Sequence, residues 1–192
     1  MTAKDYQYLI VPGWNGSPEN HWQSFWQVQL NARRVEQQNW SLPEVSAWLS
    51  QLEYMIASST APVILIAHSL GCITVAHWAM QASRFLRSKI QGALLVAPAD
   101  VERANCPEAL QGFAPISLQA LPFPSIVVGS LNDPAASAER AAQLAQAWRS
   151  EYVQLGEVGH INVASGHHQW QEGFHYLQHL IDMADKRFAS IA

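Results

Sequence analysis

The chain has 192 residues, of which 49% are apolar and 14% charged, with a net charge of −4. These values fit one domain spanning residues 1–192, with enough apolar surface to form a core. Because 11 Lys and Arg stand against 15 Asp and Glu, with no basic run, the composition argues against nucleic acid or an anionic membrane surface as a partner.

The start of the chain does not resemble a secretory signal. Residues 1–7 are largely polar and lead straight into a strand-like run, whereas a signal peptide needs an apolar stretch. No apolar segment is long enough to span a bilayer. We therefore expect a cytoplasmic location, no membrane partner, and reduced thiols at Cys72 and Cys106.

Strand-like and helix-like segments alternate along the chain. The predicted strands cover residues 6–11, 33–39, 63–67, 92–97, 125–129 and 151–155, and the predicted helices cover 20–30, 43–57, 70–83, 135–149 and 168–188. The third and fourth strands are continuously apolar, as in parallel sheets buried on both faces. The alternation predicts an α/β fold with about six mostly parallel strands and helices on both faces.

The third predicted strand leads into Ala67-His68-Ser69-Leu70-Gly71. This string matches G-x-S-x-G, with Ala67 in place of the first Gly. In that motif, a tight turn from strand to helix exposes a serine hydroxyl at the helix N-terminus, where unpaired N–H groups favour negative charge. The alternative is that Ser69 only caps the helix.

A serine nucleophile needs a base, and the base needs an orienting acid. Of eight histidines, His160 is the best candidate, because it follows the last predicted strand in a turn of small residues. Asp133 follows the preceding strand and is the candidate acid. Alternatively, Asp133 caps a helix that starts at Pro134, in which case Asp100 is the next candidate.

The loop after the first strand is expected to complete the site. The main-chain N–H groups of Leu70 and Trp14 are the predicted donors to an oxyanion. Gly13 would allow close backbone approach and His21 lies at a loop-to-helix junction, so both are predicted to bind substrate. Neither Gly-rich phosphate-loop motif is present.

The histidines near the C-terminus are the candidates for a metal site. His175 and His179 are one helical turn apart and His168 precedes them, but no Glu separates the pair as in H-E-x-x-H, and no carboxylate or Cys cluster completes a shell. We expect no metal.

Several motifs together resemble the small serine hydrolases of the retinoblastoma-binding-protein-9 type, a compact branch of the α/β-hydrolase superfamily. They are Val11-Pro12-Gly13-Trp14, Asn20-His21-Trp22, His68-Ser69-Leu70-Gly71, Asn132-Asp133-Pro134 and Gly159-His160-Ile161-Asn162. The resemblance implies a catalytic triad of Ser69, Asp133 and His160, hydrolysis of a small ester, thioester or amide through an acyl-enzyme, and no cofactor. The segment 98–124 is too short for a cap domain, so we expect none.

A protein-binding module with a vestigial hydrolase site is the alternative. The family is named for association with the retinoblastoma protein, whose pocket takes Leu-x-Cys-x-Glu peptides. The nearest string here is Leu70-Gly71-Cys72-Ile73-Thr74. It ends in Thr and lies in a predicted helix, so it could not be presented as an extended peptide. A small-molecule substrate is therefore the expected partner, and no protein partner is identified.

Overall fold

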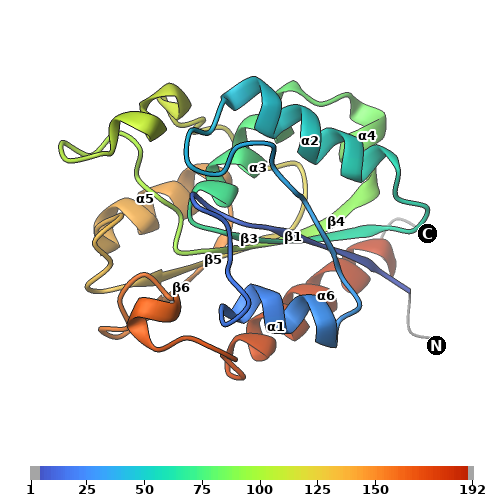
Figure 1. Ribbon diagram of the computed structural model, residues 1–192. Helices are drawn as coiled ribbons and strands as arrows, with labels where there is room; N and C mark the ends of the chain where they lie inside the picture. Colours follow the sequence, from blue (N-terminus) through green and yellow to red (C-terminus); the bar gives the residue numbers. More distant parts are fainter. Residues whose placement is uncertain (1–4, 190–192) are drawn as a thin grey trace.

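The computed structural model describes residues 5–189, with side chains through residue 187, and is built around one six-stranded sheet (Figure 1). The strands are β1 (Gln7–Val11), β2 (Arg33–Arg34), β3 (Val63–His68), β4 (Ile90–Val96), β5 (Ser125–Ser130) and β6 (Glu151–Leu155). Their order is β2-β1-β3-β4-β5-β6, and every neighbouring pair is parallel. The predicted α/β fold with a parallel sheet is confirmed.

Helices cover both faces of the sheet. The helices α1 (Trp22–Gln29) and α6 (Gly173–Ala189) lie on one face, and α2 (Val45–Ala57), α3 (Leu70–Gln81), α4 (Arg84–Lys89) and α5 (Ala138–Trp148) on the other (Figure 1). Alternate side chains of a strand point to opposite faces. Leu65 of β3 thus packs in the core beneath α2, α3 and α5, and Ile66 in the core beneath α1 and α6.

Three elements differ most from the sequence prediction. The edge strand β2 ends at Arg34 rather than residue 39. The helix α4 was not predicted, because it buries none of its residues and so has no apolar stripe, although Ser83 caps it by accepting a hydrogen bond from the Leu86 N–H. The helix α6 begins at Gly173 rather than residue 168, since Trp170, with φ 44°, takes a left-handed conformation that breaks the helix.

The connection from β4 to β5 contains no cap domain. Residues 97–124 hold one regular element, the 3₁₀ helix η1 (Glu108–Phe113). Its Leu110 and Phe113 are buried in the core beneath α2 and α3. The indole of Trp148 donates a hydrogen bond of 2.7 Å to the Ser117 carbonyl and fixes the following part of the segment.

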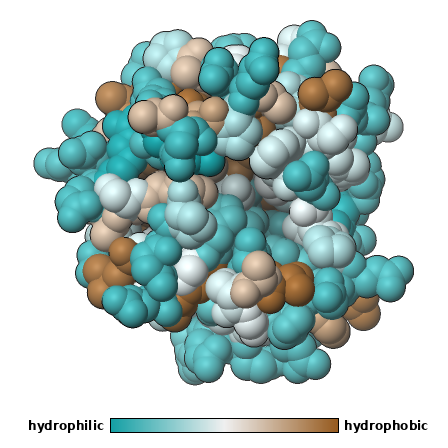
Figure 2. Space-filling view, turned by 60° about the vertical axis from the view of Figure 1, so that its left-hand side comes forward, coloured by the Kyte–Doolittle hydropathy of each residue, from teal (hydrophilic) through white to brown (hydrophobic). Residues whose placement is uncertain are grey.

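The carboxyl ends of the strands lie along one edge of the sheet, on the left in Figure 1. Figure 2, turned partway toward this edge, shows a hollow near the middle of the face, with side chains of mixed hydropathy around it. Within residues 5–189, no helix combines the length and the apolar character needed to cross a membrane.

Candidate active site

Ser69 forms the sharp turn between β3 and α3. Its backbone has φ 56° and ψ −122°, a conformation that residues other than glycine rarely adopt and that persists only where the surroundings hold it. The Ser69 N–H donates to the Val96 carbonyl of β4, and the Ser69 carbonyl accepts from the Cys72 N–H, both at 3.0 Å. The turn has the geometry predicted for a nucleophile elbow.

Two small residues flank the elbow, and only one of them must be glycine. A Cβ on Gly71 would lie 2.3 Å from the Val11 carbonyl oxygen and 2.7 Å from that of Pro12, so no larger residue fits there. Ala67, which replaces the first Gly of the motif, is fully buried in the core beneath α2 and α3, where its methyl group is accommodated. The departure at Ala67 is therefore compatible with the turn.

The side chains of Ser69, His160 and Asp133 form one continuous hydrogen-bonded chain. His160 Nε2 lies 2.9 Å from Ser69 Oγ, and His160 Nδ1 lies 2.8 and 2.9 Å from the two carboxylate oxygens of Asp133. The Asp133 side chain is 3% exposed and that of His160 is 16% exposed. Because a carboxylate only accepts, His160 Nδ1 carries the hydrogen and Nε2 is free to accept the serine proton.

Asp133 does not cap α5. The cap is Ser137, whose hydroxyl accepts from the Arg140 N–H at 3.1 Å. Asp133 Oδ1 instead accepts from the Ala135 N–H at 2.7 Å, which fixes the carboxylate in a tight turn while it faces His160.

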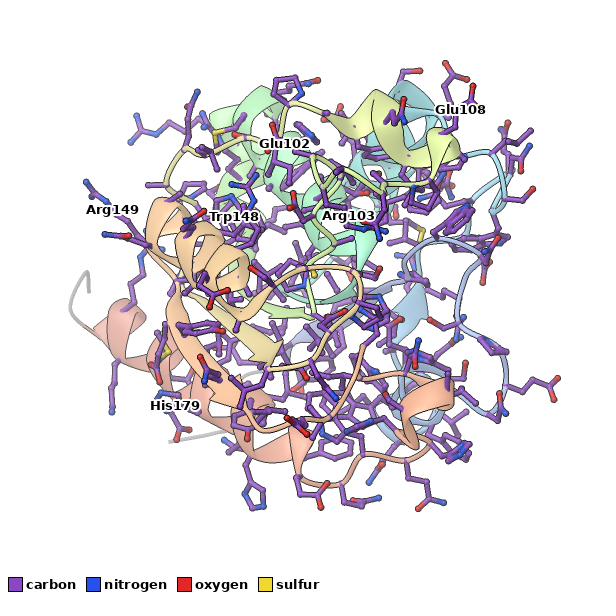
Figure 3. The ribbon with its side chains drawn as sticks, turned by 90° about the vertical axis from the view of Figure 1, so that its left-hand side faces the viewer. Glu102, Arg103, Glu108, Trp148, Arg149 and His179 are labelled. Carbon is purple, nitrogen blue, oxygen red and sulfur yellow. The ribbon has the colours of Figure 1, made fainter. Side chains whose placement is uncertain are left out.

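Asp100, the alternative acid, points elsewhere. Its Oδ1 lies 3.3 Å from Arg140 Nε and 3.1 Å from the Glu102 N–H, and Arg140 also pairs with the Glu102 carboxylate. Figure 3 looks onto the carboxyl edge of the sheet. It shows Glu102 and Arg103 on the segment after β4, on the same side of the sheet as α5. Among the described residues, no histidine forms a hydrogen bond with Asp100.

The loop after β1 lies directly against the elbow. A Cβ on Gly13 would be 2.7 Å from Ser69 Cβ and 3.2 Å from the Leu70 nitrogen, so glycine is needed for this close approach. Leu70 is the first residue of α3, and its N–H therefore has no acceptor within the helix. In the described part of the chain, the Trp14 N–H donates no hydrogen bond either, while the Trp14 indole is held by the Ser41 carbonyl at 2.9 Å.

Two buried histidines, His21 and His68, pack behind His160. The His68 ring lies 4.9 Å from the His160 ring and 5.0 Å from the His21 ring. His21 is 3% exposed and caps α1, since its Nδ1 accepts from the Gln23 N–H. Burial lowers the pKa of His21 to about 3, and it lowers the pKa of His68 well below its usual value. The structure buries the His21 ring. The substrate contact expected for His21 stays a prediction.

His68 has a contact that sequence reasoning missed. Its Nε2 lies 2.9 Å from the main-chain carbonyl oxygen of His160. The sequence places His68 beside Ser69 and indicates that the two side chains diverge, but the path of the loop after β6 decides what His68 meets.

The remaining histidines do not gather into a site. His179 of α6 forms a hydrogen bond of 2.9 Å with the Glu151 carboxylate and lies away from the middle of the carboxyl edge (Figure 3). The exposed His168 lies 3.2 Å from the Asn20 carbonyl. In the part of the chain that the structure describes, no group of three His, Cys, Asp or Glu side chains is arranged to hold a metal ion. Both cysteines are free thiols.

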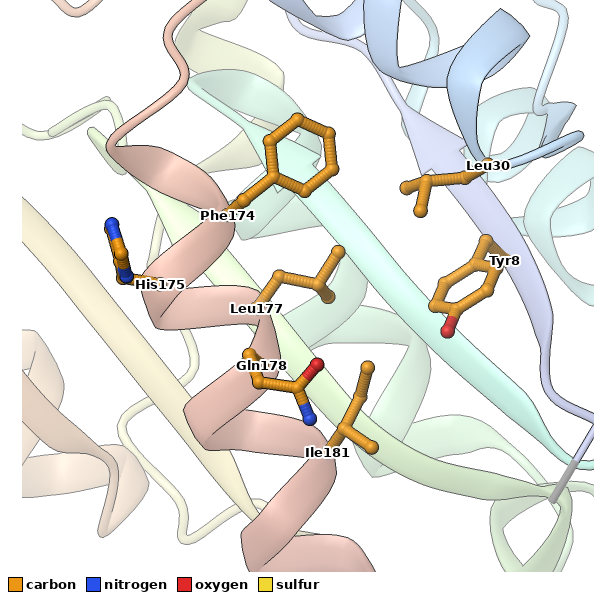
Figure 4. Close-up of a pocket in the computed structure, with 7 residues that line it drawn as sticks. All are labelled: Tyr8, Leu30, Phe174, His175, Leu177, Gln178 and Ile181. Atoms are coloured by element: carbon orange, nitrogen blue, oxygen red, sulfur yellow. The ribbon is translucent and has the colours of Figure 1, made fainter. Parts of the chain in front are cut away.

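A pocket of about 280 Å³ lies between α1, β1 and α6, apart from the three hydrogen-bonded side chains (Figure 4). Phe174, Leu177 and Ile181 of α6 face Tyr8 and Leu30 across it, so its walls are mainly apolar. His175 also lines the pocket, although its imidazole points away from these residues.

Comparison with known proteins agrees with this geometry. A protein from Pectobacterium atrosepticum, described as a YdeN-like hydrolase, is 32% identical over 94% of this chain and 92% of its own, with a TM-score of 0.82. The ydeN gene product of B. subtilis (20% identity, 93% and 100% coverage, TM-score 0.76) and a thermophilic esterase of Thermogutta terrifontis (14%, 95% and 92%, 0.66) share the fold.

No curated protein sequence matches the chain. A model of the serine hydrolase family, by contrast, matches residues 8–179, which is most of the chain. Together with the YdeN-like relative, this match confirms the family indicated by the sequence motifs. The chain belongs to the serine hydrolase family, in its retinoblastoma-binding-protein-9 and YdeN-like branch of the α/β-hydrolase superfamily.

Proposed function

We propose that the protein hydrolyses a small ester, thioester or amide through an acyl-enzyme, with Ser69 as nucleophile, His160 as base and Asp133 as orienting acid. The observation that carries the proposal is the unbroken chain of hydrogen bonds from Ser69 Oγ through the His160 imidazole to the Asp133 carboxylate. Membership of the serine hydrolase family supports it.

In the first half of the reaction, Ser69 Oγ forms a bond to the substrate carbonyl carbon while its proton passes to His160 Nε2. Asp133 stabilises the imidazolium that results. The carbonyl oxygen takes up the negative charge, and we assign the N–H groups of Leu70 and Trp14 as its hydrogen-bond donors. When the intermediate collapses, the bond to the leaving group breaks and the leaving group takes the proton from Nε2.

In the second half, water replaces the leaving group. His160 accepts a proton from the water as its oxygen attacks the acyl carbon, and the proton then returns to Ser69 Oγ as the ester bond breaks. The carboxylic acid leaves, and the enzyme is restored. These steps need only groups of the chain and water.

A binding role through the Leu70–Thr74 string has no support in the fold. These residues form the first turns of α3 and all are buried, so a partner would have to unfold the elbow to reach them. We therefore propose no second function.

A fluorophosphonate probe tests the proposal, because it reacts with an activated serine. We expect mass spectrometry to find the probe on Ser69 of the wild-type protein and none on a folded Ser69→Ala variant. Turnover of activated esters should fall by roughly three to six orders of magnitude in that variant. An unlabelled wild-type protein, or a Ser69→Ala variant with most of the activity, would contradict the proposal.

A further inference from the structure

The loop that carries His160 has a left-handed backbone on both sides of that residue. Gly159 has φ 62° and Ile161 has φ 48°. Glycine tolerates a positive φ, but Ile161 is β-branched and fully buried, and for such a side chain this conformation is a genuine outlier. Strain of this kind persists only when neighbouring groups hold the backbone in place.

Three side chains hold this backbone, one at each successive residue. Asn132 Oδ1 accepts from the Gly159 N–H at 2.7 Å. His68 Nε2 lies 2.9 Å from the His160 carbonyl oxygen, and Trp22 Nε1 donates to the Ile161 carbonyl, also at 2.9 Å.

Two of these side chains come from the turns that carry Ser69 and Asp133. His68 directly precedes Ser69, and Asn132 directly precedes Asp133. The backbone of His160 is thus tied to the same two turns that present the serine and the carboxylate to its ring. Because a carbonyl oxygen only accepts, His68 Nε2 must carry a hydrogen, and burial keeps this ring neutral by lowering its pKa.

We propose that His68 and Trp22 are positioning residues that hold the strained 159–161 loop so that His160 stays aligned with Ser69. Neither side chain contacts the reacting atoms; each acts through a main-chain carbonyl. The kinetic part of the inference rests on the proposed hydrolase function. A displacement of about 1 Å at a reacting group can cost about 100-fold in rate, so releasing one carbonyl should lower kcat by about 10- to 100-fold and leave KM nearly unchanged.

The helix α1 offers a matched control for Trp22. Trp26 is also fully buried, on the same helix, and its indole also donates to a main-chain carbonyl, that of Gln169 at 3.2 Å. The variants Trp22→Phe and Trp26→Phe therefore lose similar packing and one similar hydrogen bond. Only Trp22→Phe frees the 159–161 loop, so only this variant should show the fall in kcat, although both should lower the melting temperature.

A second pair of variants tests the hydrogen bond of His68. His68→Leu retains bulk and loses the donor, whereas the amide of His68→Gln can reach toward the position of Nε2 and donate. We expect His68→Gln to lose less of kcat than His68→Leu when both are compared on the same p-nitrophenyl ester. Equal kcat values in the two folded variants would overturn the role of the hydrogen bond.

NMR tests the positioning without any substrate. The proton that His160 Nδ1 shares with Asp133 should give a resonance far downfield, which disappears in His160→Gln. We expect this resonance to shift or broaden in Trp22→Phe and to stay unchanged in Trp26→Phe. The same spectrum in both Trp variants would overturn the inference, even in an active enzyme. The two Trp variants could differ as expected while a fluorophosphonate fails to label the wild-type protein. That combination would uphold the positioning role and contradict the proposed hydrolysis.

Discussion

Lowering the pH should destabilise the protein through His21 and His68 before the carboxylates titrate. Burial is the largest cause of the low pKa at both residues, and together with nearby charges it lowers the pKa of His21 from 6.5 to about 3. Below pH 6.5 the unfolded chain binds protons at these positions and the folded chain does not. Their contribution to stability is therefore complete above pH 6.5 and is lost as the pH falls.

The size of the effect follows from the pKa of His21. Each pH unit over which only the unfolded state is protonated is worth about 1.4 kcal/mol. At pH 5, which lies 1.5 units below 6.5 and well above 3, His21 should therefore cost about 2 kcal/mol of unfolding free energy relative to neutral pH. His68 has a shift of the same sign and adds to the loss.

The assay is urea unfolding at pH 7, 6 and 5, followed by tryptophan fluorescence, on the wild type and on His21→Asn. Asparagine keeps an acceptor for the Gln23 N–H at the start of α1 and does not titrate. The change in packing shifts the unfolding free energy of the variant by an amount that does not depend on pH. Between pH 7 and pH 5, the wild type should therefore lose about 2 kcal/mol more unfolding free energy than the variant. Parallel stability curves would refute the reasoning.

Three further outcomes follow from the site and the fold. Asp133→Asn should lower turnover by up to about 10⁴-fold by favouring the wrong imidazole tautomer, whereas Asp100→Asn should lose far less; the reverse order in steady-state assays would make Asp100 the acid. Gly71→Ala should lower the free energy of unfolding by about 1 to 3 kcal/mol in chemical denaturation. Gly156→Ala should lower it much less, since a Cβ at Gly156 meets nothing within 4 Å; equal losses would show that the backbone around Gly71 can shift to admit a methyl group. Short-chain p-nitrophenyl esters should be preferred to long-chain ones, without activation at a lipid surface, because η1 is packed into the core rather than forming a lid; a higher kcat/KM for long chains would reveal an acyl tunnel.

Sequence alone predicted the sheet well because its strands have unmistakable patterns. The segments that became β3 and β4 are continuously apolar, as strands buried on both faces are. Elements on the periphery were harder to predict. In the described part of the chain β2 pairs with β1 only, and α4 buries none of its residues, so neither leaves a periodic signal of useful length.

The sequence predicted those parts of the candidate site that depend on one local turn each. Ser69, Asp133 and His160 each follow a strand, and parallel strands bring their carboxyl ends together. The cap of α5 was ambiguous because Asp-Pro also starts helices; the carboxylate of Asp133 is instead engaged by the Ala135 N–H and His160. The contact of His68 depends on a carbonyl 92 residues away, and no local pattern encodes that distance.

The strand order places the proposed base and the proposed nucleophile at positions of unequal protection. Ser69 follows β3, whose residues are all buried between β1 and β4. His160 follows β6, which among residues 5–189 pairs only with β5 and is partly exposed along its length. Local opening begins where few buried contacts must be broken. Fraying of this one edge would carry the His160 imidazole away from an intact elbow, so the proposed hydrolase would have a route to inactivation, by heat or denaturant, that leaves most of its fold intact.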